Sequence, residues 1–61
     1  MSNFTRESAE INTYRDLSVL VQTTKDRERV IREIAMAKHL ELITKEQLEL
    51  LSGMFEFLNP L

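Results

Sequence analysis

The last third of the chain, ITKEQLELLSGMFEFLNPL, constrains the fold most, because it specifies both a helix and an excess of apolar surface. Thr44 stands three residues before Gln47 and directly ahead of an apolar periodic run, a pattern typical of a capping box. Ile43 and Leu48 are spaced to close a hydrophobic staple around this cap. The sequence therefore predicts a helix with a well-defined start that runs over about 45–58.

The apolar side chains of this helix fall into two adjoining rows when they are projected at about 100° per residue. The first row is predicted to belong to the core within the chain and consists of Leu48, Leu51, Phe55 and Leu58. The second row consists of Leu50, Met54, Phe57 and Leu61. A surface helix of a monomer needs only one apolar stripe, so the second row predicts a contact with another chain. A second copy of the chain is favoured over a different protein as its partner.

The small size of the chain also favours association. A domain of 61 residues buries only about 60% of the surface that its unfolded chain exposes. The chain has no cysteine and a single histidine, which excludes disulfides and argues against a structural zinc site. Oligomerisation is the remaining means of stabilising so small a core. We therefore predict one all-α domain over 1–61, assembled as a helical-bundle homodimer without a cofactor or metal.

Two further helices are predicted upstream. Residues 1–5 are expected to be frayed, and apolar residues at three- and four-residue spacing then predict a helix over about 6–22. A second helix is predicted over about 25–40, with Ile34 on its inward face. About three residues separate it from the third helix, so these two helices should form a tight αα-hairpin. The first helix has two alternatives, packing on its own hairpin or on that of a neighbouring chain.

The sequence lacks the residue patterns of a catalytic or metal site. His39 is the only side chain of the type that commonly exchanges protons at neutral pH, and its neighbours do not form a nucleophile–base set with it. Glu46, Glu49 and Glu56 are expected on the exposed side of the third helix, without EF-hand spacing or a Glu-x-x-His pair. The chain is therefore predicted not to be an enzyme.

A basic row on the second helix supports an alternative function. Lys25, Arg29 and Arg32 are spaced about one turn apart and are candidate contacts for the phosphates of a nucleic acid. Acidic residues interleave with this row, and the third helix carries three glutamates against one lysine, which phosphate would repel. A nucleic-acid-binding dimer is accordingly the second hypothesis.

The first hypothesis is a non-catalytic protein–protein interaction module. We expect a small regulator or inhibitor that acts on an unidentified protein partner through a dimeric helical surface, of the kind often encoded by phages and other mobile elements. No apolar run approaches the ~18 residues that span a bilayer, and the N-terminus lacks a signal pattern. A cytoplasmic location without a membrane partner is therefore expected.

Overall fold

The computed structural model describes the backbone of residues 2–60 and the side chains of residues 6–60. In this part of the chain there are three α-helices and no strand, which confirms the all-α class. The helices are α1 (Ser2–Thr23), α2 (Arg27–His39) and α3 (Lys45–Leu58). Helix α1 begins ahead of its predicted start near residue 6, because residues 2–6 contain neither proline nor glycine to interrupt it.

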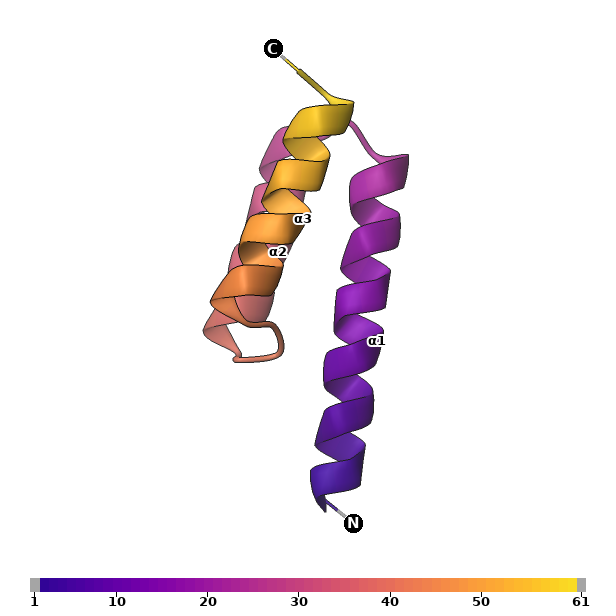
Figure 1. Cartoon of the computed structure of the whole chain (residues 1–61), viewed down its shortest axis with the longest axis vertical. Helices are drawn as coiled ribbons and strands as arrows, with labels where there is room; N and C mark the ends of the chain where they lie inside the picture. The colour runs from indigo at the N-terminus through magenta and orange to yellow at the C-terminus, as the bar shows by residue number, and fades with distance from the viewer. Residues whose placement is uncertain (1, 61) are drawn as a thin grey trace.

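The chain runs up α1, down α2 and up α3 (Figure 1). Helices α2 and α3 form a hairpin, and α1 packs against both of them within the same chain. Helix α1 is the longest, and its N-terminal turns project beyond the connection between α2 and α3 (Figure 1). The molecule is consequently elongated, with extents of 44 × 18 × 17 Å.

One apolar stripe from each helix builds the core. Its buried side chains are Leu17, Val21, Val30, Ile34, Ala37, Ile43, Leu51 and Phe55. Within each helix these residues recur three or four positions apart, so they line one face. Among the described residues, no polar or charged residue is buried, and no buried side-chain nitrogen or oxygen lacks a hydrogen-bond partner. The core is therefore closed by apolar packing within a single chain.

The start of α3 has the predicted capping box. The Thr44 hydroxyl accepts a hydrogen bond from the backbone N–H of Gln47 at 3.1 Å, and the Gln47 side chain accepts one from the backbone N–H of Thr44 at 2.9 Å. Ile43, the residue before the cap, is buried, and Leu48 packs against the core. These contacts fix both the position and the direction of α3 at its N-terminal end.

The turn between α2 and α3 contains a residue in the left-handed region. Glu41 has a φ of 60°, and its N–H donates to the carbonyl of Lys38, while the N–H of Leu42 donates to the carbonyl of Ala37. These two bonds form a Schellman motif, in which glycine usually occupies the position of Glu41. The guanidinium of Arg6 donates to the Glu41 carbonyl at 2.9 Å and so ties α1 to the same turn.

Candidate interaction surface

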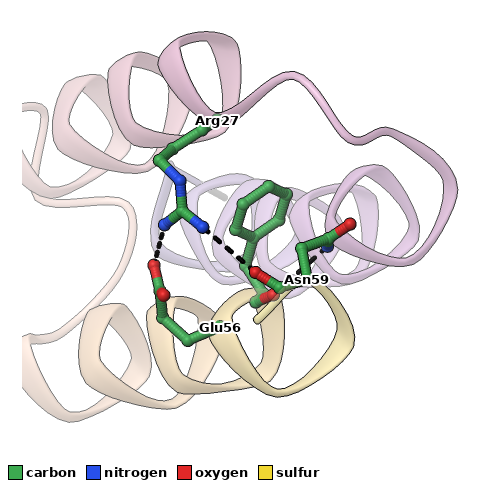
Figure 2. A network of polar contacts seen from close by, with 4 residues as sticks. Arg27, Glu56 and Asn59 are labelled. Carbon is green, nitrogen blue, oxygen red and sulfur yellow. Dashed lines mark hydrogen bonds and ion pairs between the residues drawn. The ribbon is translucent and has the colours of Figure 1, made fainter. Parts of the chain in front are cut away.

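The C-terminal turns of α3 are held by Arg27, the first residue of α2 (Figure 2). Its guanidinium pairs with the Glu56 carboxylate and donates to the backbone carbonyl of Asn59 at 3.1 Å. The guanidinium carbon also lies 5.2 Å from the centroid of the Phe55 ring, within the range of a cation–π contact. Three contacts from one side chain thus fix the rotation of α3 about its own axis near its end.

This rotation leaves part of α3 facing solvent. Phe57 is 84% exposed, and Leu50, seven residues earlier, is 61% exposed. At about 100° per residue, positions seven apart lie within about 20° of each other, so the two side chains share one side of the helix. Gly53 lies between them on the same side. We call Leu50, Gly53 and Phe57 the outer face of α3.

Met54 and Leu58 lie along one edge of the outer face. Met54 is about 160° around the helix from Glu56, which contacts α2, so Met54 lies on the α1 side. It is partly buried and packs against the core, whereas Leu58 is 47% exposed. Leu58 therefore differs from its predicted place in the core. The reason is that α1 and α3 both end at this end of the bundle, where little chain remains to cover the side chain (Figure 1).

The other residues of the two predicted rows divide between the core and the outer face. Leu51 and Phe55 are buried in the core, and Leu48 is partly buried against it. Ile34, predicted on the inward face of the second helix, is buried in the same core. Leu61, the last member of the predicted contact row, lies outside the described residues. The described part of the contact row thus consists of two strongly exposed side chains, Leu50 and Phe57, and the partly buried Met54.

Other exposed apolar side chains lie on α1, on α2 and at the C-cap of α2. They are Ile11, Val19, Ile31, Met36 and Leu40. Met36 and Leu40 line a shallow groove between α1 and α2, whose rim includes the carboxylates of Asp16 and Glu33. The sequence pattern did not indicate this groove, because it depends on how α1 packs against α2.

The basic residues are exposed but do not all lie on α2. Arg29 and Arg32 are in the helix, whereas Lys25 precedes the N-cap residue Asp26, whose side chain accepts a hydrogen bond from the backbone N–H of Arg29 at 3.2 Å. Among the described residues, none of the three basic side chains is within ion-pair distance of a carboxylate. Asp26, Glu28 and Glu33 alternate with these three residues along the chain.

The residues considered for catalysis or metal binding are dispersed. His39 is exposed at the end of α2, and the described residues contain no group of three His, Cys, Asp or Glu side chains placed to hold a metal ion. Glu46, Glu49 and Glu56 are all exposed on α3, and Glu56 pairs with Arg27. Between residues 2 and 60, no helix combines the length and apolar character that crossing a membrane requires.

Comparison of the chain with protein-family models, with curated proteins and with solved structures found no match.

Proposed function

We propose that this chain is a non-catalytic protein–protein interaction module, a small regulator or inhibitor, whose contact surface is the outer face of α3 and whose first partner is a second copy of itself. The observation that carries the proposal is the 84% exposure of Phe57 beside Leu50 on a helix held firmly at both ends. Aromatic side chains are enriched at protein interfaces, and exposed apolar patches on small proteins often mark such surfaces.

The fold of the single chain does not require the outer face. The core is closed by residues from all three helices, and neither Leu50 nor Phe57 belongs to it. The capping box and the Arg27 contacts hold α3 in place, so little ordering is needed when a partner binds. A helix that is already ordered loses less backbone entropy on association, which favours the side chains that it carries as anchors.

The strength of self-association follows from the few side chains involved. Full burial of a large apolar side chain contributes roughly 1.5–3 kcal/mol, so Leu50 and Phe57 from two copies contribute roughly 6–12 kcal/mol together. The loss of translational and rotational freedom costs about 4–15 kcal/mol. These terms are of similar size, so the dimer should dissociate on dilution. A contact of this strength can be exchanged for a larger protein partner, as a regulator requires.

Light scattering at low micromolar and near-millimolar concentrations tests this proposal. The unmodified chain should approach the mass of two chains at the higher concentration, and Phe57→Glu should stay monomeric and helical because the new charge lies outside the core. Val19→Glu is a matched control, since Val19 is 54% exposed on α1. A monomeric mass for the unmodified chain at both concentrations, or an unchanged dimer in Phe57→Glu, would overturn the proposal.

Binding of a nucleic-acid backbone is the second candidate function. It is favoured by the exposure of Lys25, Arg29 and Arg32 without an ion pair among the described residues. Replacing all three by alanine should abolish a salt-dependent complex with a labelled duplex in fluorescence anisotropy while circular dichroism stays unchanged. Failure of the unmodified chain to bind the duplex at low salt would eliminate this candidate.

A further inference from the structure

We infer that two copies of α3 cross in antiparallel orientation at Gly53, with Leu50 of each copy packed against Phe57 of the other. The inference rests on the proposed function, because it specifies how the outer face pairs with its own copy. It follows from three features of α3: a glycine that the single chain does not need, the spacing of the two exposed anchors, and the distribution of charge along the helix.

The fold of the described residues does not require glycine at position 53. It lies in the interior of α3, where glycine weakens a helix relative to alanine. Its φ is not positive, so the backbone does not demand glycine, and a Cβ atom added at this position would meet no atom of the described residues within 4 Å apart from its chain neighbours and the nearby backbone of its own helix. A glycine on a solvent-facing side, between two exposed anchors, is suited to the close approach of another helix.

The spacing of the anchors makes the outer face complementary to itself. Leu50 lies three residues before Gly53, and Phe57 lies four residues after it, so all three share one side of the helix. A two-fold axis between positions 53 and 54 places Leu50 opposite the partner copy's position 57, and Phe57 opposite its position 50. The same contact is then made twice, as a symmetric dimer interface requires.

The charges of α3 favour the antiparallel orientation. Glu46 and Glu49 lie in its N-terminal half, whereas Glu56 is paired with Arg27 on the α2 side. An antiparallel crossing keeps Glu46 and Glu49 of the two copies at opposite ends of the interface, and the two helix dipoles oppose each other. A parallel crossing would bring both copies of Glu46 and Glu49 to the same end, where like charges repel.

Single-cysteine cross-linking tests the orientation, and the natural absence of cysteine makes each product unambiguous. An oxidised mixture of Leu50→Cys and Phe57→Cys should form a mixed disulfide dimer at near-millimolar concentration, while each variant alone should cross-link much less. Positions seven apart are separated by about 10 Å along a helix, so a parallel dimer would instead cross-link each variant to itself.

The outcomes separate this inference from the proposed function. Stronger cross-linking of each variant with itself than in the mixture, while light scattering of the unmodified chain shows a dimer, would overturn the antiparallel crossing and leave the proposed function standing. A monomeric mass of the unmodified chain in light scattering at every concentration would instead overturn the proposed function.

Gly53→Ala provides an independent check. The methyl group has room in the monomer, so the variant should unfold at a higher temperature in dilute solution. The same methyl group should weaken the dimer by about tenfold, because it lies where the two helices cross. Asn12→Ala, on α1, controls for the general gain in helix propensity and should leave the dimer dissociation constant unchanged. A dimer of Gly53→Ala as tight as that of the unmodified chain would place the crossing elsewhere.

Discussion

The two sides of α3 carry similar residues but have opposite surroundings. Leu51 and Phe55 are 0% and 2% exposed, whereas Leu50 and Phe57 are 61% and 84% exposed. Side-chain chemistry therefore does not decide which leucine or phenylalanine is buried. The rotation of the helix decides it, and this rotation is fixed by the capping box at one end and by Arg27 at the other. One helix therefore has an inner side that builds the core and an outer side that faces solvent.

Truncation of the two phenylalanines should give the largest difference in stability between the two sides of α3. Phe55→Ala removes a core ring and should lower the free energy of unfolding by about 3–5 kcal/mol, enough to unfold so small a domain. Phe57→Ala should change the stability of the dilute monomer by less than about 0.5 kcal/mol. Urea unfolding followed by circular dichroism measures both. Equal losses of stability in the two variants would show that Phe57 also supports the fold.

Removal of the Arg27 contacts should loosen the C-terminal end of α3 and so reduce the difference in burial between its two sides. Arg27→Met keeps the length of the side chain but removes its charge, and should lower the free energy of unfolding by about 1–2 kcal/mol. Glu56→Gln removes only the charge of an exposed partner and should cost at most about 0.5 kcal/mol. Thermal unfolding of both variants measures the ratio. A larger effect of Glu56→Gln would mean that the ion pair, and not the ring and carbonyl contacts, holds the end of α3.

Relief of backbone strain at the hairpin turn should stabilise the fold without changing either side of α3. Glu41 has a φ of 60°, which glycine adopts at no steric cost, so Glu41→Gly should raise the free energy of unfolding by about 0.5–1 kcal/mol. Lys38→Gly, inside α2, is the matched control and should destabilise the chain by about 1 kcal/mol. A loss of stability in Glu41→Gly would contradict the account of this turn.

The sequence was sufficient to predict features that depend on neighbouring residues. The cap of α3 needs only Thr44 and Gln47, three residues apart, and the helical class follows from periodicity within each segment. Neighbouring residues do not define the start of α2 as sharply, because Thr23 and Asp26 both have side chains that can cap a helix. Asp26 caps α2, whereas the hydroxyl of Thr23 donates to the carbonyl of Val19 at 2.8 Å within α1.

Features that depend on contacts between distant segments could not be predicted in this way. Arg27 and Glu56 are 29 positions apart, and no local pattern joins them. Leu58 is exposed because α1 and α3 end at the same end of the bundle. The apolar spacing within one helix does not predict where another helix ends. The pairing of the outer face with a second copy is still a prediction, because it concerns a contact that lies outside the single chain.

NMR methyl signals of Leu50 and Leu51 in a dilution series test most directly whether two copies associate through the outer face of α3. The two residues are neighbours in the chain and about 100° apart around α3, but Leu50 is exposed and Leu51 is buried, so each serves as the reference for the other. We expect the Leu50 methyl signals to shift between near-millimolar and low micromolar concentration while those of Leu51 stay fixed. Unchanged Leu50 signals, together with shifts at Ile31 or Met36, would show that the contact surface is on α2 and not on α3.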